Sequence, residues 1–195
     1  AGTDIVFVPS LDEIYPVGFD TSVDVGGISN KLEGAFRPGH FRGVSTVVCK
    51  LLSITRSDRV YFGQKDAQQC LVVKRLSEDL NLDTEVVVVP TVRDVDGLAY
   101  SSRNIYLTRD ERKAALVMPG ALSLAKELWK GGIRDVKEMR IEMCDLIMRE
   151  PLAKIDYISV SDPQTMVELD TIDGQSLVSL AVHIGKTRLI DNVLL

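Results

Sequence analysis

The residues best suited to chemistry lie where a short apolar run, Val60–Phe62, meets a glycine and then a helical pattern. A strand that ends at Gly63 and turns into a helix leaves backbone N–H groups directed at the turn, which favours anions. Lys65 lies inside the turn and adds a mobile positive charge. Asp66 can cap the helix or bind a hydroxyl group, and Gln69 shares its helix face. The pattern predicts a site for a phosphorylated ligand with a sugar beside it. The alternative is an ordinary strand-to-helix turn with a solvated lysine.

A second polar cluster, Tyr100-Ser101-Ser102-Arg103-Asn104, lies in the glycine-broken stretch 91–107. Two adjacent hydroxyls and a guanidinium suit phosphate oxygens, because arginine offers a bidentate fork and serine adds short donors. A connection of this length inside a folded domain is often functional. The alternative is a polar loop with a structural arginine.

The third cluster is the run Glu33–Phe41, whose glycines and proline present Arg37 and His40 toward one side. A histidine on an apolar face is also compatible with a core residue, and neither histidine of the chain sits by a nucleophile elbow. With Lys65 and Arg103, these two side chains are candidates for one pocket. Local positive charge of that kind focuses an anionic substrate and steadies a polyphosphate leaving group.

Composition limits the classes of partner. Of 195 residues, 45% are hydrophobic and 26% charged, which is ordinary for a globular protein. The net charge of −5 argues against nucleic acid as the main partner.

Two histidines rule out a His-rich metal site and leave room for Mg²⁺ shared between carboxylates and phosphates. Three cysteines without a C-x-x-C pair indicate reduced thiols in a cytoplasmic protein. No apolar run is as long as a membrane span, and no signal pattern opens the chain.

Three firm strands, Asp4–Val8, Val60–Gly63 and Glu85–Val89, alternate with helical patterns in the first half. Short apolar strands between helices predict a parallel sheet buried on both faces. The longer helices are expected to start at Pro38 and Asp66, the second reaching Asn81. Their expected buried stripes are His40, Val44, Val47, Leu51 and Ile54 in the first, and Gln69, Val73, Leu76 and Leu80 in the second. Smaller expected elements are a helix at Leu11–Ile14, a brief strand at Val23–Val25, and a helix Lys31–Phe36 capped by Ser29.

The second half has a different pattern. Thr108 and Glu111 form a capping box for a helix toward Trp129, interrupted near Pro119. Gly131-Gly132 ends it, and Asp135 caps another helix. Three strands are expected to follow, at Ile155–Val160, Leu177–Ile184 and Arg188–Leu194. This order predicts a small α+β domain with an antiparallel sheet. We place the domain boundary at residue 91, with domains 1–91 and 92–195.

The first region offers fewer parallel strands than an α/β sheet usually has. A doubly wound fold flanks its nucleotide site with its first strand and the following helix. We therefore expect the chain to be the back part of a larger α/β enzyme.

The motifs, taken together, resemble pantothenate synthetase (the pantoate–β-alanine ligase family) over essentially the whole length. The runs that carry the resemblance are Phe7–Pro16, Leu32–Val44, Tyr61–Gln69, Asp96–Asn104 and Arg188–Asn192. The resemblance implies a Rossmann-like nucleotidyltransferase domain, a C-terminal lid domain and a homodimer. It also implies a two-step reaction, in which ATP activates pantoate as an acyl-adenylate and β-alanine then displaces AMP. No nucleic acid or membrane partner is expected.

The same resemblance assigns roles to individual residues. Gly63 and Asp66 would hold the ATP ribose, with Gln64 beside them. Lys65, together with the Ser101-Ser102-Arg103 run, would bind phosphates and act in catalysis. Val92 and the Tyr100 region would contact adenine, and Gln69 would hold pantoate. Arg37 and His40 look like pocket-wall residues.

The chain also departs from the family pattern. Tyr100 stands where the family has methionine or leucine, and Gln64 where it has glutamate. The family's G-x-x-H-x-G-H motif does not occur in this sequence. We therefore predict a fragment that lacks the N-terminal part and does not catalyse the reaction unaided. The alternatives are a non-catalytic nucleotide-binding or dimerisation fragment, and another adenylyl-transferring nucleotidyltransferase.

Overall fold

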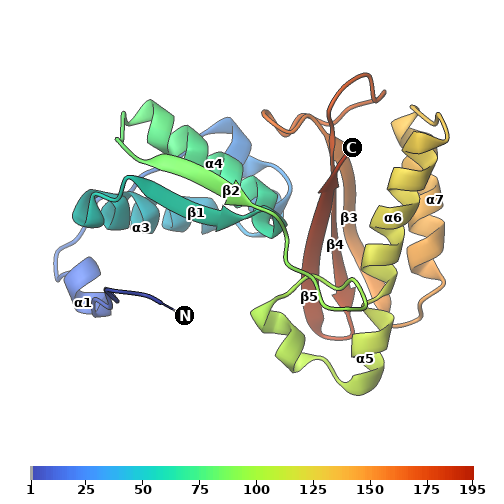
Figure 1. Ribbon diagram of the computed structural model, residues 1–195, viewed down its shortest axis with the longest axis horizontal. Coiled ribbons are helices and arrows are strands. Elements are labelled where there is room, and N and C mark those ends of the chain that lie inside the picture. The colour runs from blue at the N-terminus through green and yellow to red at the C-terminus, as the bar shows by residue number, and fades with distance from the viewer. Residues whose placement is uncertain (1) are drawn as a thin grey trace. The chain divides into compact units, whose positions relative to one another are not determined.

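The computed structural model describes residues 2–195 (Figure 1). Its internal contacts divide the chain into unit 1, Ala1–Val60 with Val72–Val86, and unit 2, Tyr61–Leu71 with Val87–Leu195. The elements in chain order are α1 (Leu11–Ile14), η1 (Gly27–Asn30), α2 (Glu33–Phe36), α3 (His40–Thr55), β1 (Arg59–Gly63), η2 (Gln64–Asp66), α4 (Ala67–Asp79), β2 (Glu85–Val89), η3 (Ser102–Tyr106), α5 (Arg109–Ala114), α6 (Val117–Lys130), α7 (Val136–Met148), β3 (Ala153–Ser161), β4 (Leu177–Ile184) and β5 (Thr187–Leu194), where η marks a 3-10 helix.

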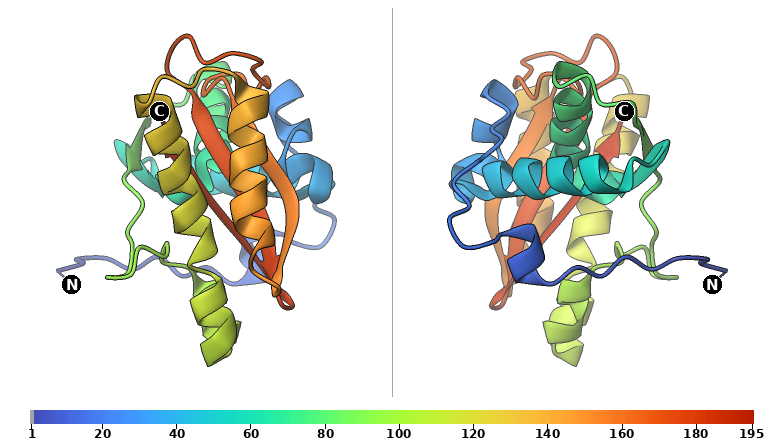
Figure 2. Two further views of the ribbon diagram at one scale, coloured as in Figure 1. Left: turned by 90° about the vertical axis from the view of Figure 1, so that its right-hand side faces the viewer. Right: turned by 90° about the vertical axis from the view of Figure 1, so that its left-hand side faces the viewer.

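The last three strands of unit 2 form an antiparallel sheet in the order β3-β4-β5. Helices α6 and α7 lie side by side on one face of this sheet (Figure 2, left). A bulge between Ile155 and Tyr157 shifts the register of β3. The predicted antiparallel α+β arrangement is confirmed.

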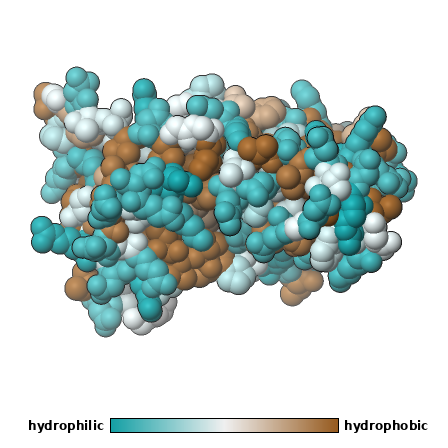
Figure 3. All heavy atoms as spheres, turned by 90° about the horizontal axis from the view of Figure 1, so that it is seen from above, coloured by the Kyte–Doolittle hydropathy of each residue, from teal (hydrophilic) through white to brown (hydrophobic). Residues whose placement is uncertain are grey.

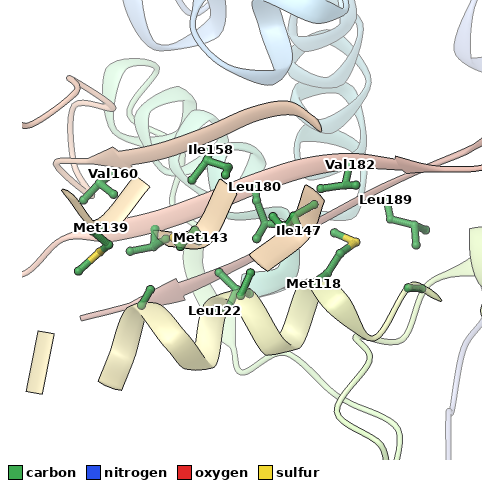
Figure 4. Packing of buried hydrophobic residues seen from close by; sticks show 14 of the residues in the cluster. Met118, Leu122, Met139, Met143, Ile147, Ile158, Val160, Leu180, Val182 and Leu189 are labelled. Carbon is green, nitrogen blue, oxygen red and sulfur yellow. The ribbon is translucent and has the colours of Figure 1, made fainter. Parts of the chain in front are cut away.

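The core of unit 2 lies between this sheet and its two helices. On α7 the buried residues recur every three or four positions, which puts them on one helix face. Figure 4 shows the α7 residues Met139, Met143 and Ile147 among side chains from the strands, with Leu122 of α6 beside them. The hydrophobic period therefore decides which helix face is buried. The buried residues of α7 are Val136, Met139, Met143 and Ile147.

Polar caps set the helix limits in unit 2 as predicted. The Thr108 backbone N–H donates to Glu111 Oε2 at 2.8 Å, and the Glu111 N–H donates to Thr108 Oγ1 at 3.3 Å. Asp135 Oδ1 accepts a hydrogen bond from the Glu138 N–H at 2.9 Å. The predicted interruption falls between α5 and α6. It leaves Pro119 in the first turn of α6, where the backbone N–H has no helical partner to lose.

In unit 1, helices α3 and α4 share a small core of Val25, Phe41, Val72 and Leu76. Ahead of α3 in sequence runs a tight segment in which a Cβ atom at Gly34 would collide with the backbone carbonyl of Ser29. Only glycine fits there, which explains the first glycine of the Glu33–Phe41 run.

Strands β1 and β2 form a two-stranded sheet and run in the same direction (Figure 1). Both predicted strands are confirmed, but their expected full burial is wrong, because every residue in them is half-buried or exposed. Tyr61 and Val89 are exposed, and hydrophobic side chains reach the surface among hydrophilic ones (Figure 3). The apolar sequences of β1 and β2 suit a sheet that is covered on both faces, and a two-stranded sheet does not provide that cover here.

Three predictions near the start of the chain are wrong. Asp4–Val8 is not a strand, and Ile5, Val6 and Val8 are largely exposed. A strand needs a neighbouring chain to take its backbone hydrogen bonds, and no strand among the described residues pairs with this one. Val23–Val25 is irregular, its Val23 N–H donating to Thr46 Oγ1. Ser29 caps no helix, because its hydroxyl donates to the Val25 carbonyl. The helix at Leu11–Ile14 is confirmed.

The long helix begins at His40 and not at Pro38. Gly39 precedes it with a left-handed φ of 78°, so the helix does not extend back to the proline. Its buried face is also displaced from the predicted stripe: Phe41, Ser45 and Leu52 are buried, while Ile54 is half exposed. Apolar residues cover a wide arc of this helix, so periodicity alone does not decide which face packs.

The next helix, α4, follows the short turn η2 and ends at Asp79. Val73 and Leu76 are buried as predicted, but Leu80 lies past the helix end and is exposed. Within residues 2–195, none of the helices has the length and apolar character that crossing a membrane requires.

Candidate functional site

The turn Gly63–Asp66 lies between β1 and α4, as the sequence predicts. Gly63 precedes η2 with an extended backbone, and a Cβ atom there would meet nothing within 4 Å. The glycine is therefore not needed for backbone geometry. Because it has no side chain, the space next to the turn is left open. The Cys70 thiol donates to the Gly63 carbonyl at 3.2 Å, which ties α4 to the turn.

Lys65 supplies the positive charge of this turn. Its side chain is 18% exposed, and Nζ lies 3.5 Å from Asp66 Oδ1. Such a long and partly solvated ion pair contributes little to stability. Lys65 is thus a nearly buried cation with only a weak internal partner, an arrangement that suits an incoming anion.

Residues from the far end of the chain hold this turn. Asn192 of β5 contacts Gln64 and Lys65, which lie more than 120 positions away in sequence. Sequence reasoning gave no role to Asn192, although the Arg188–Asn192 run contributed to the family resemblance. Two polar residues in the middle of an apolar strand, Asp191-Asn192, were the available signal, because buried polar groups need partners.

The second predicted segment folds back on itself beside β5. The Tyr100 N–H donates to the Val92 carbonyl at 2.9 Å, so these two residues are neighbours, as their shared predicted role requires. Both side chains are exposed. The Ser101 hydroxyl accepts from the Arg103 N–H at 3.2 Å and caps η3. The Arg103 guanidinium donates through Nη1 to the Arg188 carbonyl of β5 at 3.2 Å. Ser102, also predicted to bind phosphate, opens η3 and is exposed.

A second arginine, missed by sequence reasoning, anchors this segment. Arg93 makes a bidentate pair with Asp191, with Nη1–Oδ2 at 2.6 Å and Nη2–Oδ1 at 2.9 Å. Its Nη1 also donates to the Gly97 carbonyl at 3.0 Å. The Asp191 side chain is 2% exposed, so this carboxylate depends on Arg93 for its compensating charge.

The loop tip is held from α5 by Arg112. Its guanidinium lies 2.9 Å from Asp94 Oδ2 and 2.8 Å from Asp96 Oδ2. Its hydrogen bond holds the pKa of the Asp96 carboxyl below the ordinary value. The pKa of the Tyr100 phenol lies above its usual 10.0. The larger cause is its hydrogen bond to the Asp94 carboxylate, and the smaller is the repulsion between that carboxylate and an ionised phenolate.

The Tyr100 phenol is therefore expected to ionise at a higher pH than an isolated tyrosine. Its hydrogen bond to Asp94 is fully present below the ordinary pKa and is lost as pH rises through the higher folded-state value. The measurement is the ultraviolet titration of phenolate, taken as the difference between the wild type and Tyr100→Phe. Asp94→Asn should move the midpoint back toward 10.0. Identical midpoints with and without Asp94 would contradict this assignment.

Arg37 and His40 belong to unit 1 and contact each other, with Arg37 Nη1 3.0 Å from His40 Nε2. The His40 ring also packs against Phe41 at a centroid distance of 5.0 Å. Their place in one pocket with Lys65 stays a prediction. Gln69 is half-buried on α4, and its role toward pantoate also stays a prediction.

The arrangement in unit 2 defines a class of protein. An anion-favouring strand–turn–helix with an almost buried lysine and a serine–arginine segment both contact one strand, β5. Positive charge and backbone donors gathered in this way are typical of enzymes that handle phosphate esters of nucleotides.

Comparison with known proteins identifies the family. The family model for pantoate-beta-alanine ligase matches residues 1–194. The pantothenate synthetase of Heliobacterium modesticaldum is 55% identical over 99% of this chain and 69% of its own length. That of Pelotomaculum thermopropionicum is 53% identical over 100% and 69%. The chain belongs to the pantoate–β-alanine ligase family, so the predicted family and enzyme class are confirmed.

Solved structures agree with this assignment. The crystal structure of pantothenate synthetase from Thermus thermophilus matches with a TM-score of 0.95 at 42% identity, over 98% of this chain and 70% of that one. A Francisella tularensis pantoate–β-alanine ligase, described as complexed with β-γ ATP and β-alanine, matches with a TM-score of 0.68 at 35% identity, over 94% and 61%. The chain thus spans 69% of the length of the curated relatives named above, as the prediction of a partial family sequence requires.

Proposed function

We propose that this chain carries part of the nucleotide site of an ATP-dependent ligase that joins pantoate to β-alanine. The observation that supports it best is the attachment of both predicted phosphate-binding segments to β5: Asn192 contacts the turn, and the Arg188 carbonyl accepts from Arg103. The proposed reaction forms a bond between the pantoate carboxylate and the α-phosphorus of ATP, with loss of pyrophosphate. The β-alanine amine then attacks the acyl carbon, and AMP leaves.

In this proposal Lys65 and Arg103 stabilise the charge that develops on the transferring phosphate group, and Ser101 and Ser102 add hydroxyl donors. Little covalent chemistry is asked of the protein, so positioning and electrostatic stabilisation carry the rate. Gly63, Gln64 and Asp66 are proposed beside the ribose, Val92 and Tyr100 beside adenine, and Gln69 beside pantoate.

Magnesium is proposed as a companion of ATP. No group of three or more potential metal-binding side chains occurs among residues 2–195, and Asp66 is the one carboxylate within the turn. Mg²⁺ usually keeps several waters and binds through one or two carboxylates and substrate phosphates. The donor set therefore fits an ion brought by the phosphates. When bound, such an ion would neutralise phosphate charge.

The Rossmann-like character of the first domain and the homodimer are proposed from the resemblance. The boundary at residue 91 is proposed from the change in sequence pattern there, and the cytoplasmic location from the cysteine usage. The three cysteines are free thiols, in keeping with a reducing compartment. Sedimentation at several protein concentrations would test the dimer.

The test of the proposed function is pantoate-dependent exchange of labelled pyrophosphate into ATP. We expect exchange from the longest natural chain that contains this sequence, and none from the 195 residues alone, because they lack the G-x-x-H-x-G-H motif. Calorimetric titration with ATP should still give binding heat for the 195-residue chain. Exchange by the longer chain that does not require pantoate would overturn the proposal, and exchange by the 195 residues would show that the missing motif is dispensable.

A further inference from the structure

The side-chain amide of Asn192 forms hydrogen bonds with the Gln64–Lys65 turn. Its Nδ2 atom donates to the backbone carbonyls of Gln64 and Lys65, each at 2.9 Å. Its Oδ1 atom accepts from Gln64 Nε2 at 3.1 Å. Because carbonyl oxygens only accept, the amide nitrogen must face them. Asn192 is 5% exposed, so its donors have little water as an alternative.

These two bonds orient successive peptide planes. In a trans peptide the N–H points opposite to the C=O of the same plane. With the Gln64 carbonyl directed at Asn192, the Lys65 N–H points away from it. The Lys65 carbonyl is also directed at Asn192, so the Asp66 N–H points away from Asn192. Asn192 therefore turns the Lys65 N–H toward the side of the turn opposite β5, while the Asp66 N–H belongs to the i→i+3 hydrogen-bond pattern of η2.

Asn192 is itself held rigidly. It lies in the β4–β5 ladder directly opposite Ser179. Its own N–H donates to Asp191 Oδ1 at 2.8 Å, and Asp191 is fixed by Arg93. A side chain on a paired strand next to a buried ion pair has little freedom, so it can impose its geometry on the turn.

We propose that Asn192 is a positioning residue for the nucleotide. It orients the Lys65 N–H for an anionic oxygen without touching the ligand, and Gln64 keeps the Asn192 amide in place. The inference rests on the proposed function, because it takes the turn to be the nucleotide site. It assigns the Gln64 side chain to Asn192, so the proposed place of Gln64 beside the ribose rests on its backbone.

The chain offers two variants of different severity and one matched control. Asn192→Asp keeps the shape and replaces the two donors by an oxygen that repels the carbonyls. Gln64→Met removes only the bond to Asn192 Oδ1, at a half-buried site where unfolding is not expected. Ser179→Ala alters the residue opposite Asn192 and leaves the amide intact.

Two measurements on the 195-residue chain read out the effect. Hydrogen exchange without nucleotide should become faster at residues 64–67 in Asn192→Asp and Gln64→Met, and stay unchanged in β3–β5. The calorimetric Kd for ATP should rise about tenfold in Gln64→Met and more in Asn192→Asp, the size expected from loss of one or more buried hydrogen bonds. Ser179→Ala should change neither.

The outcomes separate the inference from the proposed function. Faster exchange at the turn with unchanged ATP affinity would overturn the positioning role and leave the nucleotide site standing. Exchange that rises equally in β3–β5 would reduce Asn192 to a general stability role and also overturn it. If the wild type binds no ATP, the proposed function fails, and the inference fails with it.

Discussion

Lys65→Met is expected to raise the Kd for ATP by about tenfold to a hundredfold. The substitution removes the cation of the turn, and a hydrogen bond between charged partners is worth about 1.5–3 kcal/mol. Stability should hardly change, because the internal partner of Lys65 is the half-exposed Asp66 at 3.5 Å. Calorimetric titration with ATP measures the first effect, and urea unfolding followed by Trp129 fluorescence checks the second.

Lys74→Met is the matched control for this prediction. Lys74 lies on α4, nine residues further along, with an exposed side chain. The same substitution removes the same charge from the protein and should leave ATP affinity within about twofold, because exposed charges at a distance are screened. If both lysine variants weaken ATP equally, long-range charge and not the turn is responsible.

Arg93→Met is expected to cause the largest loss of stability, about 3 kcal/mol of unfolding free energy. It leaves the Asp191 carboxylate buried without its partner. We expect the lower end of the range for broken buried pairs, because the Arg93 side chain is 31% exposed and water can partly replace it. The measurement is urea unfolding followed by the fluorescence of Trp129, the one tryptophan of the chain, which is partly buried and packs against the unit 2 core.

Two companions test the cause of that loss. Adding Asp191→Asn to Arg93→Met removes the stranded charge and should recover part of the stability. Arg140→Met breaks the half-exposed pair with Glu168 in the same unit and should cost less than about 1 kcal/mol. An Arg93→Met loss no larger than that of Arg140→Met would show that Asp191 does not depend on its partner.

Local chemistry accounts for most of what the sequence predicted correctly. The capping box at Thr108 and the cap at Asp135 are decided by residues within four positions of each other. The strands β1 and β2 follow from short apolar runs next to turn residues. The Gly63–Asp66 turn was found in the same way, since its strand, glycine and lysine are contiguous.

The predictions that failed depended on partners outside the local segment. Asp4–Val8 has the composition of a strand, but pairing decides whether it becomes one. The apolar arc of α3 permits more than one buried face, and packing against Val25 and α4 selects Phe41 over Ile54.

The sequence by itself determined the family, the order of the main helices and strands from β1 onward, and the residue types present at the Gly63–Asp66 turn and at Ser101–Arg103. The reason is that contiguous motifs and caps carry these features. Only the tertiary structure decided what holds those residues in position. Asp191 and Asn192 anchor Arg93 and the Gly63–Asp66 turn through contacts that span about a hundred residues or more. Hydrogen bonds of that range depend on how the chain folds back on itself, and no local pattern encodes which buried polar groups will meet.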